Sequence, residues 1–201
     1  MSAGAHSWQN VVWEGRFQPV HLGHLSYMRR VLERCDHLWV WVLANEVSTD
    51  VVADRSMLPV PQFTAAVDPH HRAEKNPLPF WLRYRLVIDA VTTELGSGAP
   101  VTVCGGRRLD LQWDLYRKIL PPDRVFLTPT RDEFEDSKAA AWAILGEEVA
   151  RVDVFDLPAI SATMIRDRLK VGSSVEGLMA PSTIALLADS GFLDALASQG
   201  A

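Results

Sequence analysis

Short apolar runs alternate along this chain with segments in which apolar residues recur at helical spacing. The run LWVWVL at 38–43 contains no polar residue. A strand with one face in water would alternate between polar and apolar residues, so this run is typical of a parallel strand that is covered on both faces. The repetition of strand and helix predicts an α/β fold, a doubly wound parallel sheet with right-handed crossovers and helices on both faces.

The expected elements follow from the position of each apolar run. We expect strands at 10–14, 38–43, 100–106, 124–129 and 152–157. We expect helices at 22–34, 80–95, 111–120 and 137–148, and two more that begin near Ser161 and Pro181. The charged stretch RDEFED at 131–136 is expected to be an exposed segment that leads into a helix.

One segment does not fit this alternation. Residues 46–79 contain five prolines and show little periodicity. Connections of this length are uncommon inside a compact domain. We therefore expect a functional lid, a binding loop or a disordered excursion, and the sequence alone does not decide among them.

Composition limits the class of protein. The chain has 201 residues, which is the length of a single domain, 1–201, and 48% of them are apolar. The formal net charge of -5 speaks against nucleic-acid binding, which depends on many Lys and Arg contacts to phosphates. No apolar run reaches membrane-spanning length, and the N-terminus lacks a basic region followed by an apolar one. We expect a cytoplasmic protein with no nucleic-acid or membrane partner.

The stretch GRFQPVHLGH at 15–24 follows the first expected strand. Ligands of open parallel sheets bind at the carboxyl ends of strands, so chemistry is expected here. Gly15 frees the backbone as the strand ends, and Gly23 allows close approach at the start of a helix, whose unpaired N–H groups favour an anion. His21 and His24 would face the same space and form a site for phosphate oxygens.

Two other interpretations of the histidine pair stay open on the sequence alone. The rings could bond to nearby backbone at the start of the helix, or they could belong to a zinc site. Zinc requires further ligands at suitable spacing, and Cys35 and Cys104 do not provide it. No metal-binding residue is therefore assigned.

The stretch GRFQPVHLGH resembles the HxGH signature of the nucleotidylyltransferase superfamily, in the GRFQPxHxGH form of archaeal-type nicotinamide mononucleotide adenylyltransferases. A second signature of this branch, ISxTxIR, is matched by ISATMIR at 160–166. The branch includes cytidylyltransferases that place CMP on small phosphonates. The resemblance implies a Rossmann-like fold and transfer of a nucleotide from a nucleoside triphosphate, with release of pyrophosphate and no covalent intermediate.

The resemblance also implies roles for individual residues. His21 and His24 would donate hydrogen bonds to triphosphate oxygens, and Arg166 would stabilise the departing pyrophosphate. Ser161 and Thr163 would cap the next helix and bind β- and γ-phosphate oxygens. The other nucleotide-binding candidates are Gly15, Arg16, Phe17, Gly23 and Arg85. For Arg16 a surface salt bridge is an equal alternative.

Candidates for acceptor binding begin with FWLRYR at 80–85. Arg83 and Arg85 are two positions apart and cannot share one helical face. The family has an Arg where Arg85 stands, so Arg85 is assigned to phosphate and Arg83 to the acceptor. Trp81 either stacks on a base or fills the core, and the core is the more common place.

A second set of acceptor candidates lies in GGRR at 105–108, after the third expected strand. The two glycines permit close approach of a ligand, and Arg107 or Arg108 would bind an anionic group of the acceptor. A tight turn with solvated arginines is the equal alternative.

The acceptor region departs from the family pattern, because a longer, proline-rich segment stands before the helix that carries Arg85. This departure favours CTP-dependent cytidylyl transfer to a small phosphonate or phosphate, with nicotinamide mononucleotide adenylyltransferase as the alternative. A non-catalytic nucleotide-binding regulator with the same fold is the third interpretation. Mg²⁺ is expected to arrive with the triphosphate. Members of the family often assemble, which leaves a homo-oligomer open.

Overall fold

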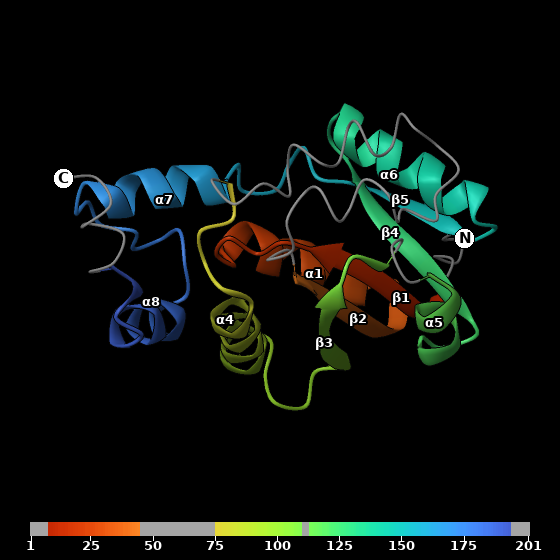
Figure 1. Ribbon diagram of the computed structural model, residues 1–201, viewed down its shortest axis with the longest axis horizontal. Coiled ribbons are helices and arrows are strands. Elements are labelled where there is room, and N and C mark those ends of the chain that lie inside the picture. The colour runs from red at the N-terminus through yellow and green to blue at the C-terminus, as the bar shows by residue number, and fades with distance from the viewer. Residues whose placement is uncertain (1–7, 45–74, 110–112, 194–201) are drawn as a thin grey trace, which may run out of the picture.

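The computed structural model describes residues 8–44, 75–109 and 113–193 of the chain. In this part of the chain five strands form one sheet in which every neighbouring pair is parallel. The strands are β1 (Trp8–Gly15), β2 (Cys35–Ala44), β3 (Val101–Arg107), β4 (Arg124–Thr130) and β5 (Val149–Asp153). Their order in the sheet is β3-β2-β1-β4-β5 (Figure 1). From β1 the chain adds β2 and β3 on one side of the sheet, and then β4 and β5 on the other side of β1. The order of the strands therefore reverses between β1 and β4, which is the switch point of the sheet.

Helices connect the strands and lie on both faces of the sheet (Figure 1). They are α1 (Leu22–Leu32), α4 (Phe80–Glu94), α5 (Trp113–Ile119), α6 (Glu133–Ile144), α7 (Ala162–Lys170) and α8 (Pro181–Asp189). Helices α1 and α4 pack against β2, and α6 packs against β4 and β5. The architecture is the Rossmann-like α/β fold that the sequence predicts.

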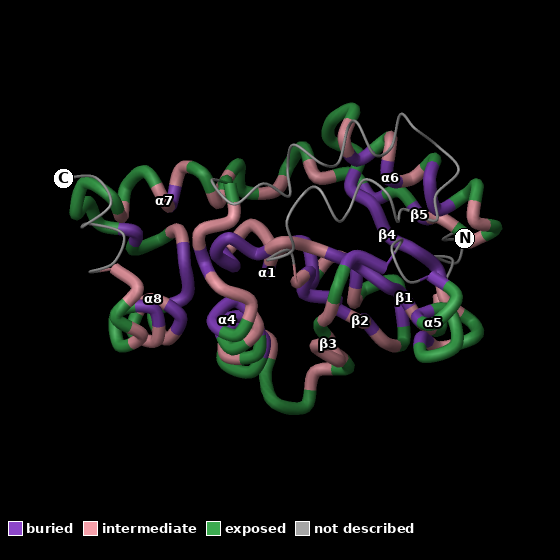
Figure 2. The backbone as a smooth tube through the Cα atoms, in the orientation of Figure 1, coloured by how far each residue is buried: buried purple, intermediate pink, exposed green. Residues whose placement is uncertain are grey.

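Two apolar cores lie on opposite faces of the sheet, because neighbouring residues of a strand point to opposite sides. Val11 of β1 belongs to the core that includes side chains of α1 and α4, whereas Val12 belongs to the core formed with α5 and α6. Val40 and Trp41 of β2 divide in the same way. Both faces of the central strands are therefore buried, as Figure 2 shows for β1, β2 and β4.

Four elements begin earlier than the sequence predicts: β1 at Trp8 rather than 10, β2 at Cys35 rather than 38, and β5 and α6. Helix α6 begins at Glu133 rather than 137, because Oδ1 of Asp132 accepts a hydrogen bond from the N–H of Glu135 (3.0 Å) and caps the helix. The prediction that RDEFED is an exposed segment ahead of a helix is therefore right only in part: 131–133 and Asp136 are exposed, but 133–136 belong to the helix and Glu135 is buried. Strand β5 likewise spans 149–153 rather than 152–157.

Some predictions fall outside the described residues. Of the segment at 46–79, only 75–79 lies within them, so its expected role as a lid or loop stays a prediction. The single domain, the cytoplasmic location and the homo-oligomer also stay predictions. None of the helices that the structure describes is long and apolar enough to cross a membrane.

Candidate active site

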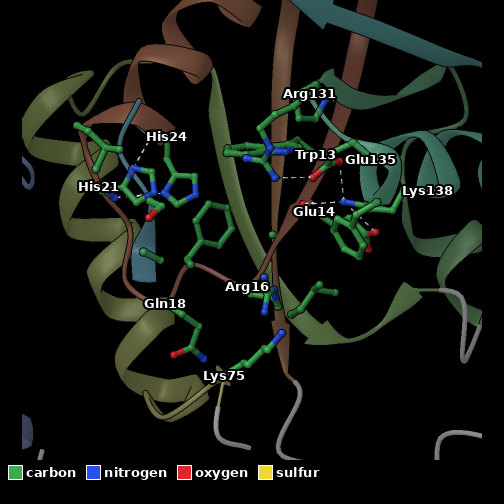
Figure 3. Close-up of a pocket in the computed structure, with 18 of the residues that line it drawn as sticks. Trp13, Glu14, Arg16, Gln18, His21, His24, Lys75, Arg131, Glu135 and Lys138 are labelled. Carbon is green, nitrogen blue, oxygen red and sulfur yellow. Dashed lines mark hydrogen bonds and ion pairs between the residues drawn. The ribbon is translucent and has the colours of Figure 1, made fainter. Parts of the chain in front are cut away.

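A pocket of about 520 Å³ opens at the carboxyl ends of β1 and β4, next to the switch point of the sheet. Its walls come from the end of β1 and the loop to α1, from the residues after β4, and from the start of α7 (Figure 3). His21, His24, Ser161 and Arg166 all line it. The two sequence motifs, which lie far apart in the chain, thus meet at one space.

His21 and His24 cap α1 reciprocally. Nδ1 of His21 accepts a hydrogen bond from the backbone N–H of His24 (3.3 Å), and Nδ1 of His24 accepts one from the backbone N–H of His21 (3.2 Å). The rings stack with their centroids 3.6 Å apart. Since Nδ1 is an acceptor in both rings, each neutral imidazole carries its proton on Nε2. The local backbone bonds therefore leave one N–H donor on each ring for a ligand.

Burial keeps both imidazoles in the neutral form. Burial, with a smaller contribution from the charge of Arg131, lowers the pKa of His21 from 6.5 to about 3. Burial also lowers the pKa of His24, and His21, Arg131 and Arg16 act in the same direction. At neutral pH each ring therefore offers an uncharged Nε2–H donor.

The glycines of the first motif make room for side chains. A Cβ atom on Gly23 would lie 3.1 Å from Nδ1 of His21 and 3.2 Å from the carbonyl oxygen of Pro158. A Cβ atom on Gly15 would lie 2.8 Å from the ring of Phe17. Phe17 is buried and packs edge-on against His24, with ring centroids 5.1 Å apart. Gly15 and Phe17 line the pocket, whereas Gly23 is not among its described lining residues and acts through the position of His21.

The start of α7 is held against the histidine loop. Oγ of Ser161 accepts a hydrogen bond from the N–H of Met164 (3.1 Å) and caps the helix. Arg166 donates to the carbonyl of Gln18 (2.7 Å) and to Oγ1 of Thr163 (3.2 Å). Thr163 does not cap α7 as predicted, because it lies inside the first turn and orients Arg166 instead. The bond to Gln18 fixes the two motifs relative to each other.

The pocket is positive although the chain as a whole is acidic. Among its described lining residues, six are cationic and two are carboxylates, whereas the net charge of the chain is -5. The cations are Arg16, Lys75, Arg108, Arg131, Lys138 and Arg166. Burial, followed by the charge of Arg166, lowers the pKa of Arg16 to about 10, so this guanidinium stays protonated at neutral pH. A pocket with this charge favours a polyanion.

Arg83 supports the floor of the site. It is 0% exposed, and its guanidinium donates to the carbonyls of Leu78 (2.9 Å), Arg16 (2.8 Å) and Leu43 (2.5 Å). These carbonyls belong to the ends of β1 and β2 and to the residues before α4. The prediction that Arg83 contacts the acceptor is corrected: its donors bind the backbone beneath the pocket.

The other acceptor candidates, together with the phosphate candidate Arg85, divide into one that lines the pocket and several that do not. Arg108 is buried and lines it, whereas Arg107 and Arg85 are exposed and are not among its described lining residues. Trp81 is 52% exposed, so it does not fill the core as expected. A Cβ atom on Gly105 would lie 2.6 Å from the ring of Phe80. This glycine accommodates an aromatic side chain rather than a ligand.

A buried charged cluster was not predicted from the sequence. Nζ of Lys138 lies 3.6 Å from Oε1 of Glu14 and 3.6 Å from Oε2 of Glu135, and a guanidinium nitrogen of Arg131 lies 3.4 Å from Oε1 of Glu135. Burial alone would lower the pKa of Lys138, but Glu135 and Glu14 outweigh it and raise the pKa, so the ammonium stays charged. The helical spacing of Arg131, Glu135 and Lys138 was the available signal. Glu14 is 124 positions from Lys138, and no local pattern links the two.

Comparison with known sequences identifies the family. The model of the family described as cytidylyltransferase-like matches residues 12–168. A phosphonoformate cytidylyltransferase from Streptomyces viridochromogenes is 27% identical over 191 residues, which cover 90% of this chain and 91% of the relative.

Comparison with solved structures agrees with the fold. A structure from Vibrio parahaemolyticus assigned as a nicotinate-nucleotide adenylyltransferase has a TM-score of 0.59 at 16% identity, covering 92% of this chain and 95% of the other. A bifunctional NMN adenylyltransferase/ADP ribose pyrophosphatase from Francisella tularensis has a TM-score of 0.60 at 15% identity, covering 96% of this chain and 53% of the other. The chain therefore belongs to the cytidylyltransferase-like family of the nucleotidylyltransferase superfamily and is a nucleotidyltransferase.

Proposed function

We propose that this enzyme transfers CMP from CTP to a small phosphonate or phosphate acceptor and releases pyrophosphate. The observation that carries the proposal is the pocket in which two neutral Nε2–H donors and the start of α7 face one space with a positive lining. The 27% identity to a phosphonoformate cytidylyltransferase, over nine tenths of both chains, supports the choice of base and acceptor.

The chemistry is a single displacement at phosphorus. An acceptor oxygen attacks the α-phosphorus, a new P–O bond forms, and the bond to the β-phosphate oxygen breaks as pyrophosphate leaves. His21 and His24 donate from Nε2 to phosphoryl oxygens on which charge develops. Catalysis rests on this positioning and on charge stabilisation, so no side chain has to form a covalent intermediate.

In this proposal the leaving pyrophosphate binds at the start of α7. Ser161 and the first N–H groups of this nine-residue helix form an anion site. Arg166 uses one nitrogen for the carbonyl of Gln18 and another for Thr163, which fixes the plane of its guanidinium. Its remaining N–H donors bind the charge that accumulates on the leaving group.

The acceptor is placed at the ends of β2 and β3. Leu43 of β2 and Arg108 after β3 line the pocket, as do Lys75 before α4 and Arg16 after β1. A short acceptor with two or more negative charges matches these cations.

Mg²⁺ enters with the triphosphate in this proposal. The described residues include no group of three or more His, Cys, Asp or Glu side chains that could hold a metal ion, and both pocket carboxylates are ion-paired with Lys138. These side chains do not fit a resident metal, and phosphate oxygens and water are the ligands that Mg²⁺ prefers. No step above depends on a protein-bound ion.

Nicotinamide mononucleotide adenylyltransferase is the second candidate. The form of both motifs favours it. A large planar acceptor would need an apolar platform, and the described residues at the β2 and β3 side provide Leu43 together with cations. A non-catalytic nucleotide-binding regulator is disfavoured, because the chain belongs to a family of nucleotidyltransferases.

Pyrophosphate release from a matrix of substrates tests the proposal. CTP, ATP, GTP and UTP are each combined with phosphonoformate, inorganic phosphate and nicotinamide mononucleotide. The proposal expects turnover with CTP and a small anionic acceptor, and turnover only with ATP and nicotinamide mononucleotide would establish the alternative. His24→Ala should lower kcat about a hundredfold or more, because it removes a donor to the transition state. His37→Ala, in the first half of β2 and outside the described pocket lining, is the matched control.

A further inference from the structure

Phosphate binding does not explain the buried cluster of Glu14, Glu135 and Lys138. Figure 3 shows the cluster across the pocket from His21 and His24. Two carboxylates at a polyanion site would repel the ligand, since like charges in a poorly solvated site interact strongly. This end of the pocket is therefore suited to an uncharged part of the substrate.

Oε2 of Glu135 keeps hydrogen-bonding capacity that the described residues around it do not use. Nζ of Lys138 lies 3.5 Å from the carbonyl oxygen of Glu14 and 3.6 Å from a carboxylate oxygen of each glutamate. Charge-assisted hydrogen bonds are usually about 2.7–2.9 Å long. Glu135 is 6% exposed, lines the pocket, and its Oε2 accepts no hydrogen bond from the described part of the chain. A buried carboxylate oxygen in this state gains most from a ligand that donates to it.

Aromatic rings also line the pocket. Trp13 packs against His24, with ring centroids 5.8 Å apart, and both Trp13 and Phe134 line the pocket. Nζ of Lys138 is 5.7 Å from the centre of the Phe134 ring. Aromatic surfaces beside a few polar groups suit a nucleobase, which stacks through its faces and forms hydrogen bonds through its edge. The pocket thus has a phosphate end and a base end.

We propose that Glu135 and Lys138, positioned by Glu14, read the base of the triphosphate and select an exocyclic amino group over a carbonyl. This inference rests on the proposed function and specifies its nucleotide. Cytosine presents the N4 amino donor beside the N3 acceptor, so the carboxylate of Glu135 accepts from N4 while Lys138 donates to the ring nitrogen. Uracil presents a carbonyl and an N–H at these two positions, which places its O4 against the carboxylate.

The same pattern extends to purines. Adenine presents an amino group beside an unprotonated ring nitrogen, as cytosine does, and hypoxanthine presents a carbonyl beside an N–H, as uracil does. CTP with UTP and ATP with ITP are therefore matched pairs in which the amino group is exchanged for a carbonyl and the neighbouring ring nitrogen gains a proton. The cluster selects the amino member of a pair, and ring size is selected by other walls of the pocket.

Calorimetric titration of the full chain with these four triphosphates, in the presence of Mg²⁺, tests the inference without an acceptor. In the wild type the amino member of at least one pair should bind about tenfold tighter or more, because the carbonyl member leaves Oε2 of Glu135 without a hydrogen-bond donor. Glu135→Gln keeps the shape of the side chain and replaces one acceptor by a donor, so the ratio within the pair should fall to about threefold or less.

Two further variants keep the test decisive. Glu133→Gln lies in the same turn of α6 at an exposed position and should leave the ratio unchanged. Glu14→Gln removes the carboxylate of β1 that positions Lys138, so it should also lower the ratio of affinities within the pair. This variant provides the test if Glu135→Gln does not fold.

The outcomes separate this inference from the proposed function. If the ratios of Glu135→Gln and Glu14→Gln equal that of the wild type, the cluster does not read the base, whereas pyrophosphate release still supports the transferase. An equal affinity for both members of each pair in the wild type would also overturn the inference. If no triphosphate binds and none releases pyrophosphate, the proposed function fails, and the inference fails with it.

Discussion

Replacing His21 by Asn should make the stability of this protein less sensitive to acid. In the wild type Nδ1 of His21 caps α1 and must be unprotonated to accept the hydrogen bond from His24. Asn is also a good N-cap, and its side-chain oxygen does not titrate. The substitution therefore keeps the cap and removes its dependence on protonation.

The magnitude follows from the pKa of His21, which is 6.5 in the unfolded reference and about 3 in the folded protein. Between these values the unfolded chain binds a proton that the folded chain does not, so the free energy of unfolding falls as the pH drops below about 6.5. At pH 5 this window covers about 1.5 pH units, and at about 1.36 kcal/mol per unit the loss is about 2 kcal/mol. The pKa of His24 is also lowered, so His24 acts in the same direction.

Urea unfolding of both proteins at about pH 7.5 and about pH 5 measures the effect. The wild type should lose about 2 kcal/mol more than His21→Asn between the two conditions. Other titrating groups are common to both proteins, so their contributions largely cancel in this difference. An equal loss in the two proteins, or a larger loss in the variant, would show that the folded protein does not hold His21 neutral.

Two further predictions concern residues that shape the site from below. Arg83→Met removes hydrogen bonds to three backbone carbonyls, of which that of Leu78 has a second side-chain donor, Nε2 of Gln18. It should lower the free energy of unfolding by about 3 kcal/mol or more, whereas Arg85→Met should change it by less than about 0.5 kcal/mol. Gly105→Ala places a Cβ atom 2.6 Å from the ring of Phe80 and should cost about 1–3 kcal/mol, while Gly98→Ala meets nothing within 4 Å and serves as control. Chemical denaturation checks both, and equal stability within either pair would refute the packing that we describe.

The layered fold could be predicted from the sequence because its signal is local. An unbroken apolar run such as 38–43 predicts a strand that is buried on both faces. The structure confirms this, because side chains of this strand belong to two cores on opposite faces of the sheet. The early start of α6 was missed because its first turn is acidic, although Asp132 and Glu135 have the spacing of a capped helix start. Charge suggested exposure there, but the buried ammonium of Lys138 compensates Glu135.

The candidate site could be predicted in part. The motifs located His21 and Arg166, because each motif is a contiguous stretch at the start of a helix. Spacing separated Arg83 from Arg85 but could not tell which one faces inward, since that depends on how α4 is rotated against the sheet. The ion pair of Glu14 with Lys138 could not be predicted from the sequence. It forms only because β4 pairs with β1, which brings α6 and its Lys138 close to Glu14.

A crystal structure of the protein with a non-hydrolysable analogue of CTP tests the central claim most directly. The account predicts that Nε2 of His21 or His24 and the N-terminal groups of α7 at Ser161 lie about 2.7–3.2 Å from oxygens of one and the same triphosphate. A triphosphate bound to the imidazoles but turned away from α7, or bound at α7 without reaching either ring, would contradict it.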